Sequence, residues 1–190
     1  MNIRGFVNPS ADNPRSNPIS LSDQQLYDYN SFGTTVTANS TAEYFQTVRN
    51  LPGRAYVPGA GRLSDTQTFT ITSIGCKGYY NDQTSITALD LAVLGNTELT
   101  FIKNSTTTVF RALTSSLLFP GGANSGAATD VPSFGINSWN AVLQLPEPMQ
   151  IVLQQNDSYS VQIKNSEALT LSAASELQVV LTGLLAQYAS

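Results

Sequence analysis

Apolar and polar positions alternate along much of this chain, and the pattern is clearest near its C-terminus. Over residues 159–164, Tyr, Val and Ile alternate with Ser, Gln and Lys. Residues 177–182 repeat the alternation before Gly183, which permits a bend. A strand that buries one face has this two-residue period. A half-buried strand is therefore predicted at residues 159–164, and a further strand is predicted at residues 177–182.

Shorter β-favouring runs precede these two strands. Residues 68–72 alternate so that Phe69 and Ile71 share a face, but the phase shifts at Ile74, and the glycines nearby suggest a bulge or a bend. Further strands or apolar runs lie at residues 34–38, 42–48, 97–103, 107–118, 139–145 and 149–154. A total of about eight or nine strands predicts an all-β domain, either a sandwich or a barrel.

One segment fits a helix better than a strand. Ile86, Leu89 and Val93 share a helical face within residues 86–95, and Gly95 is a suitable stop. A buried strand is the alternative that the pattern leaves open. Little other helix is expected.

The first 31 residues predict an N-terminal arm ahead of a domain formed by residues 32–190. Three X-Pro pairs favour extended or turn conformations, and the apolar residues up to position 19 show no period. A short helical turn could begin at Ser22, because serine caps helices well. Residues 119–138 are rich in small residues and predict a long loop, of a kind that is usually functional or part of an interface.

The residue types that carry most enzyme chemistry are scarce in this chain. It has no histidine, a single cysteine (Cys76) and only 12% charged residues. Nucleophiles that depend on histidine and conventional zinc sites are therefore excluded, and no phosphate-binding loop is present. Cys76 is expected to be a small buried hydrophobic residue. We expect no enzyme activity, no cofactor and no metal site.

Two kinds of carboxylate chemistry stay open at this point. A pair of acids for glycoside hydrolysis depends on distances in the fold. Five acids lie in or beside predicted elements: Glu43, Asp90, Glu98, Glu147 and Glu176. Solvated surface carboxylates are the alternative that we favour. Asn81-Asp82 and Asn156-Asp157 offer oxygen ligands for calcium, but neither has the spaced acidic pattern of a calcium loop.

The charge balance argues against a dedicated nucleic-acid binder. Thirteen acidic residues outnumber nine Lys and Arg, which gives a net charge of −4, whereas such proteins carry a basic patch. Arginines gather in the first 62 residues, but nearby acids make that part about neutral. No stretch approaches the ~20 apolar residues of a transmembrane helix, and the N-terminus lacks the apolar core of a signal peptide.

Taken together, the strand-like segments resemble those of the single jelly-roll capsid proteins of tailless icosahedral viruses, particularly bacteriophages. Residues 34–45 and 68–75 look like the first strands of such a barrel, and residues 145–154, 159–163 and 177–183 look like the last three. The resemblance implies a single jelly-roll β-barrel or sandwich of about eight strands. Residues 86–95 and 119–138 would be insertions in this plan.

The resemblance also implies a function through assembly. The chain would be a viral structural protein of the virion, a capsid (shell) subunit that self-assembles as trimers or larger homo-oligomers through its barrel faces and its arm. Its partners would be other copies and other virion proteins, without specific nucleic-acid binding, and it would be made in the host cytoplasm without a signal peptide. Candidate assembly residues are Ile3, Arg4, Phe6, Val7 and Arg15 in the arm and Phe119, Val131 and Phe134 in the long loop.

A carbohydrate-binding module, or a spike or decoration head, is the alternative function. Exposed aromatic rings can stack on sugars, and Tyr79, Tyr80 and Trp139 are the candidates for such a surface. In an extended strand, Tyr79 and Tyr80 point to opposite faces, so only one of them can join a given platform. Trp139 begins an apolar run, and a core position is the simpler expectation for it.

Overall fold

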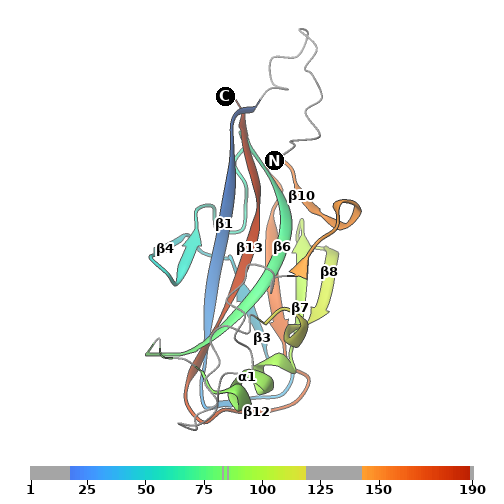
Figure 1. The fold of residues 1–190 in the computed structure, drawn as a ribbon. Helices are drawn as coiled ribbons and strands as arrows, with labels where there is room; N and C mark the ends of the chain where they lie inside the picture. Colours follow the sequence, from blue (N-terminus) through green and yellow to red (C-terminus); the bar gives the residue numbers. More distant parts are fainter. Residues whose placement is uncertain (1–17, 83, 85, 119–142, 189–190) are drawn as a thin grey trace.

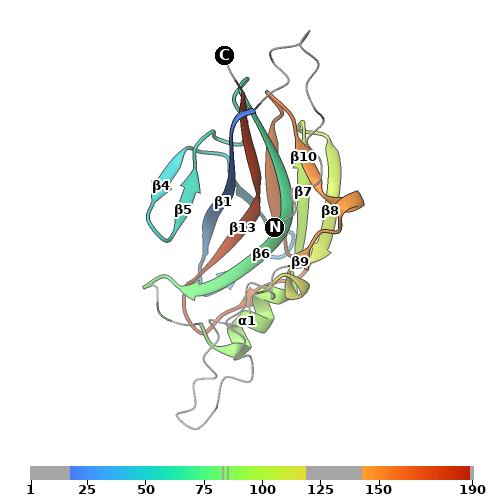
Figure 2. The same ribbon diagram turned by 45° about the horizontal axis from the view of Figure 1, so that its top comes forward.

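The computed structural model describes residues 18–82, 84, 86–118 and 143–188, and within them two antiparallel sheets pack face to face (Figures 1 and 2). The larger sheet has the strand order β10–β6–β13–β1–β5–β4, and the smaller has the order β3–β11–β7–β8. The larger sheet is built from β1 (Pro18–Phe32), β4 (Arg49–Leu51), β5 (Ala55–Val57), β6 (Gln67–Tyr80), β10 (Ile151–Leu153) and β13 (Ser175–Tyr188), and β9 (Leu143–Gln144) pairs with β6 as well. The smaller sheet is built from β3 (Thr41–Tyr44), β7 (Glu98–Lys103), β8 (Thr107–Leu113) and β11 (Tyr159–Lys164). The predicted all-β class is confirmed.

Short elements close one end of the sandwich. The strands β2 (Thr35–Val36) and β12 (Leu169–Thr170) pair with each other, and the helix α1 (Ala88–Gly95) lies at the same end as β12 (Figure 1). Two single 3₁₀ turns, η2 (Thr114–Ser116) and η5 (Glu147–Met149), complete the described elements.

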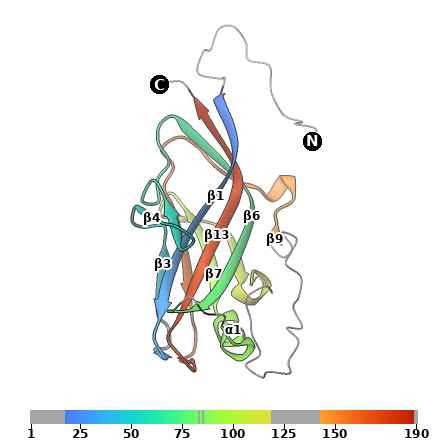
Figure 3. The same ribbon diagram turned by 60° about the vertical axis from the view of Figure 1, so that its left-hand side comes forward.

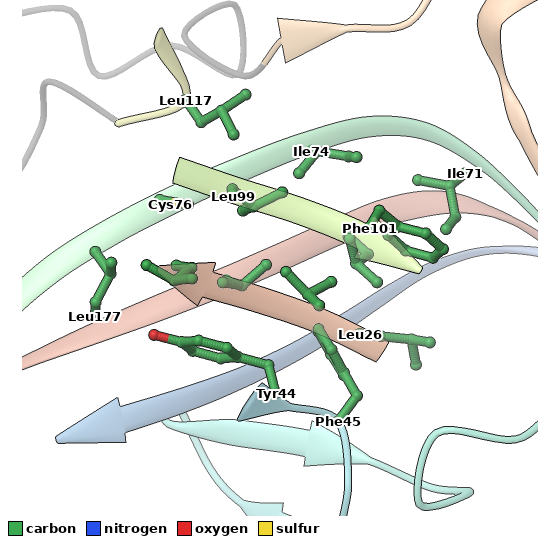
Figure 4. Packing of buried hydrophobic residues seen from close by; sticks show 14 of the residues in the cluster. Leu26, Tyr44, Phe45, Ile71, Ile74, Cys76, Leu99, Phe101, Leu117 and Leu177 are labelled. Carbon is green, nitrogen blue, oxygen red and sulfur yellow. The ribbon is translucent and has the colours of Figure 1, made fainter. Parts of the chain in front are cut away.

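Side chains from both sheets form one hydrophobic core between them (Figure 4). Phe69 and Ile71 share the inner face of β6, as their alternation predicts, and both are fully buried. From the smaller sheet, Phe101 stacks on Tyr159, with 6.2 Å between the ring centroids. Burial of a large apolar side chain stabilises the fold by about 1.5–3 kcal/mol. This interior explains the strict period of residues 159–164.

The phase shift in β6 is a bulge against β13. Thr182 pairs with Ser73, but the next residue, Gly183, pairs with Ile71, so that Thr72 is the extra residue. The Thr72 hydroxyl donates a hydrogen bond back to the Thr182 carbonyl, 3.2 Å away. The bulge lets both halves of β6 keep an apolar face toward the core, which is the reason for the shift seen at Ile74 in the sequence.

The boundary predicted for the N-terminal arm is wrong. Residues 18–32 form β1, which pairs with β13 from Pro18 to Phe32 and lies inside the larger sheet. The first half of β1 is polar. There β1 and β13 extend past the smaller sheet, so no hydrophobic core covers this part of the strand (Figure 3). The turn expected at Ser22 is therefore strand, and only residues 1–17 precede the sheet.

The helix forms where it is expected, but it buries a different face. Leu89 is 74% exposed, whereas Asp90, Leu91 and Leu94 are buried. Thr87 caps the helix by accepting a hydrogen bond from the Asp90 amide at 3.3 Å. The Asp90 side chain turns inward to meet hydroxyl groups of neighbouring segments, and this polar anchor decides which face the helix buries.

Candidate functional site

The residues predicted for assembly lie outside the described part of the chain. They are Ile3, Arg4, Phe6, Val7, Arg15, Phe119, Val131 and Phe134, and Trp139 of the alternative glycan surface lies outside it too. These residues stay predictions.

Tyr79 and Tyr80 do not form a common aromatic platform. The Tyr80 hydroxyl lies 2.8 Å from an Asp90 carboxylate oxygen, to which it donates, and it accepts from the Thr87 amide at 3.2 Å. Tyr79 lies on the opposite side of β6, where it pairs with Glu176 of β13. Burial raises the pKa of the Tyr79 hydroxyl above its ordinary value. Tyr80 is thus committed to anchoring the helix, which leaves a single ring of this pair for any ligand.

Asp90 is an anchor between three segments of the chain. Its carboxylate accepts hydrogen bonds from the Ser172 amide at 3.0 Å, from the Ser172 hydroxyl and from Tyr80. Burial by itself raises the pKa of Asp90, but the hydrogen bonds from Ser172, Tyr80 and Thr87 outweigh it and lower the pKa below the ordinary value. A fully satisfied, ionised carboxylate of this kind suits a structural role better than proton transfer.

The other acids considered for chemistry are also engaged or exposed. Glu176 is buried and forms an ion pair with Arg54, and Glu98 lies 3.3 Å from Arg111 at the surface. Glu43 and Glu147 are exposed. In the described part of the chain, no group of three or more acidic or cysteine side chains is placed so that it could hold a metal ion.

A hairpin formed by β4 and β5 is clamped to the larger sheet by two ion pairs. Arg49 lies 2.9 Å from the buried Asp28 carboxylate, and Arg54 pairs with the buried Glu176. Both guanidinium groups lie over the ring of Tyr29. The distance from the arginine Cζ atom to the ring centroid is 4.4 Å for Arg54 and 5.2 Å for Arg49. A Gly/Pro-rich segment with two arginines does not by its sequence reveal which distant acids the arginines meet.

Two titratable side chains, Cys76 and Tyr44, lie fully buried in the core. Cys76 is a free thiol with no exposed surface, and burial raises its pKa far above the ordinary value. Burial also raises the pKa of the Tyr44 hydroxyl, which lies in the same core and has no hydrogen-bond partner. The prediction that Cys76 is a buried hydrophobic residue is confirmed.

Several large apolar side chains of the described structure are exposed. Large apolar residues with substantial exposure are Val48, Leu51, Leu89, Val109, Leu113, Leu143, Met149 and Val152. The last five of these belong to β8, β9, η5 and β10. In Figures 1 and 2, the strands β8 and β10 lie on the same side of the molecule. This β8–β10 side is the strongest candidate for a surface that meets another molecule.

Other surface features are weaker candidates. An open hollow of about 530 Å³ lies between the end of α1 and residues 166–170, and Val93 and Asn96 line it on the helix side. It contains no buried charged group that could orient a ligand. No helix in the described residues is long and apolar enough to span a membrane.

Comparison of this chain with protein-family models, with curated proteins and with solved structures gives no match.

Proposed function

We propose that this chain is a virion structural protein, a capsid subunit built on a single jelly roll that assembles with copies of itself. The observation that carries the proposal is the order in which the main strands pair along the chain. These strands are β1, β3, β6, β7, β8, β10, β11 and β13.

The pairings are nested. The first of these eight strands pairs with the last, the second with the seventh, the third with the sixth and the fourth with the fifth, each time antiparallel. The chain thus follows the path of one long hairpin. Rolling such a hairpin brings β13 beside β6 and β11 beside β7, and both pairs are present. This nested order of eight strands supports the jelly-roll plan that we propose.

Jelly rolls serve in viral capsids, in lectins and in cupins, so the fold alone leaves the function open. Metal-dependent cupin chemistry is disfavoured because the chain has no histidine. A lectin site built on Tyr79 and Tyr80 is disfavoured because the two rings lie on opposite sides of β6 and Tyr80 is bound to Asp90. Assembly is the use that the remaining features support.

The charge distribution of the described domain suits a protein that is covered by neighbours. Two of its arginines, Arg49 and Arg54, pair with the buried carboxylates of Asp28 and Glu176. Their charges are therefore largely compensated within the subunit. Because charged groups are depleted from the centre of interfaces, a low outward charge lowers the cost of covering this surface. The exposed apolar residues of the β8–β10 side add to the same tendency.

Light scattering after size-exclusion chromatography, followed by electron microscopy, tests the proposal on the full chain. We expect trimers or larger species whose share grows with protein concentration, and closed shells or lattices in the images. Removal of residues 1–17 should reduce the larger species while the secondary structure, measured by circular dichroism, is kept. A protein that stays monomeric at millimolar concentration, with or without these residues, contradicts the proposal.

A further inference from the structure

The strand β8 has an open edge in the described part of the chain. It ends the smaller sheet, and only its inner side pairs with another strand, β7. The corresponding edge of β6 in the larger sheet is covered by β10, by β9 and by a bridge from Cys76 to Leu118. The other end strands of the two sheets are shorter: β3 has four residues, and β4 and β10 have three each, whereas β8 has seven.

Both faces of β8 carry apolar side chains. Val109 and Leu113 point outward and are 40% and 61% exposed. Phe110 and Ala112 alternate with them, pack against the core and remain half-buried. Strands that are apolar on both faces are typical of the interior of a sheet, and proteins normally protect a long apolar edge by charge, proline or a covering segment. The one charged residue in β8 is Arg111, which is engaged by Glu98 of its own subunit.

We propose that β8 pairs with β8 of a second copy around a two-fold axis, so that the two smaller sheets join into one. The proposal rests on the assembly function proposed above and names the contact through which two copies first meet. Two-fold contacts are the commonest arrangement among homo-oligomers, and an antiparallel strand pair satisfies this symmetry by itself. The strands β9 and β10 lie on the same side of the molecule as β8 (Figure 2).

The side chains of β8 complement one another when the axis passes through Arg111. On the inner face Phe110 then lies opposite Ala112 of the partner subunit, so that a large side chain meets a small one. On the outer face Leu113 comes beside Val109 of the partner subunit, which is the bulge residue of β8 against β7. Apolar and aromatic pairs across strands each stabilise a sheet. The two copies of Arg111 face each other, and each keeps its own carboxylate neighbour in Glu98. This neighbour offsets part of the repulsion between the two like charges.

A cysteine at the axis provides the most direct test. In the Arg111→Cys variant the two thiols of a dimer would face each other at the short distance of a cross-strand pair, which permits a disulfide. Mild oxidation should therefore convert most of the full-length variant into covalent dimers. Leu89→Cys, at the exposed position on α1, is the matched control and should remain monomeric. The native Cys76 is buried and gives little background. Absence of covalent dimers from Arg111→Cys overturns the proposal.

A charge substitution measures the contact without a crosslink. Leu113→Lys should weaken dimerisation roughly tenfold or more in sedimentation velocity, because symmetry removes two apolar pairs per dimer. Leu89→Lys should leave the dissociation constant unchanged, and circular dichroism checks that both variants fold. Equal dimerisation of Leu113→Lys and the unmodified chain overturns the proposal. Loss of dimers when residues 1–17 are removed would show that those residues, and not β8, make the contact, and this overturns the proposal as well. Shells that still form from Leu113→Lys would reject this contact while leaving the proposed function standing.

Discussion

Replacement of Gly183 by alanine should force apart the two central strands of the larger sheet. A Cβ atom at this position would lie 2.0 Å from the carbonyl oxygen of Thr70 and 2.9 Å from the Cα of Ile71. Both atoms belong to the backbone of β6, the strand that pairs with β13 across the bulge. A flexible side chain could turn away from a new methyl group, but a strand that is bonded on both sides cannot.

The magnitude follows from this geometry. An extra methyl group in a well-packed region costs about 1–3 kcal/mol, and contact with backbone atoms belongs at the upper end of that range or above it. Alanine also restricts the unfolded chain, which returns only about 0.4–1 kcal/mol. We therefore expect Gly183→Ala to lower the free energy of unfolding by about 3 kcal/mol, and the melting temperature by roughly 6–12 °C for a domain of this size.

Urea unfolding followed by circular dichroism measures this loss, with Gly33→Ala as the matched control. A Cβ at Gly33 would find its nearest neighbour at 3.7 Å, which is an ordinary contact, and that residue is exposed. The control should change the free energy of unfolding by less than about 0.5 kcal/mol. If Gly183→Ala lowers the free energy of unfolding by less than about 1 kcal/mol, the backbones of β6 and β13 are not as close at the bulge as the structure shows. The argument from close approach would then fail.

Three further predictions concern buried polar groups. Asp90→Asn should cost about 1–3 kcal/mol near neutral pH, because hydrogen bonds to a buried acceptor are lost. The folded state lowers the pKa of Asp90, so the ionised carboxylate contributes its full share to the free energy of unfolding above the unfolded pKa of about 3.9, and this share is lost as the pH falls through the folded pKa. Urea unfolding measured below about pH 4 should therefore show a weaker dependence of stability on pH in the variant. An unchanged dependence of stability on pH argues against the role of Asp90 as an anchor. Arg54→Ala should lower the free energy of unfolding by about 1–3 kcal/mol, because Glu176 keeps fewer partners. Arg62→Ala, at an exposed position, should change it by almost nothing in the same assay. Equal losses in the two variants would contradict a stabilising role for the ion pair between Arg54 and Glu176. The Cys76 thiol should react with a thiol reagent only at the rate of unfolding, and fast labelling of the folded protein would show that the core is open there.

The strands with a strict two-residue period could be predicted because one rule decides them. Residues 159–164 and 177–181 each line the same core, so every second position must be apolar, and the structure has strands in both places. The bulge was also visible, as a phase shift near Ile74. These features are local in the sequence, and a local pattern was enough to find them.

The strand β1 could not be recognised by the same rule. Its inner face carries Leu26 and Phe32, but between them lies the buried Asp28, which accepts hydrogen bonds from the Phe45 amide at 2.6 Å and from Arg49. A buried carboxylate breaks the alternation, and its partners come from a segment some twenty residues away. The same limit hid the clamp formed by Arg54 and Glu176, which are separated by more than one hundred positions.

The orientation of the helix was missed for a related reason. The apolar residues Leu89 and Val93 favoured one buried face, but Asp90 turns toward Ser172 and Tyr80 and takes the inner position instead. A polar side chain can decide a burial pattern when its partners satisfy all of its hydrogen bonds. Those partners come from β6 and from the segment before β13, and nothing in residues 86–95 identifies them.

The placement of the arginines bears on what the protein binds. Most of them fall in the first 62 residues, so this segment has the highest share of positive charge in the chain. Yet Arg49 and Arg54 are turned onto Tyr29 and paired with the buried carboxylates of Asp28 and Glu176. Arginines held in this way stabilise the hairpin and cannot also neutralise a row of phosphates. If they turned toward phosphates, the two buried carboxylates would lose their ion pairs with these arginines. For Arg49 and Arg54 the structure therefore shows a role in folding, and these two arginines add no argument for nucleic-acid binding.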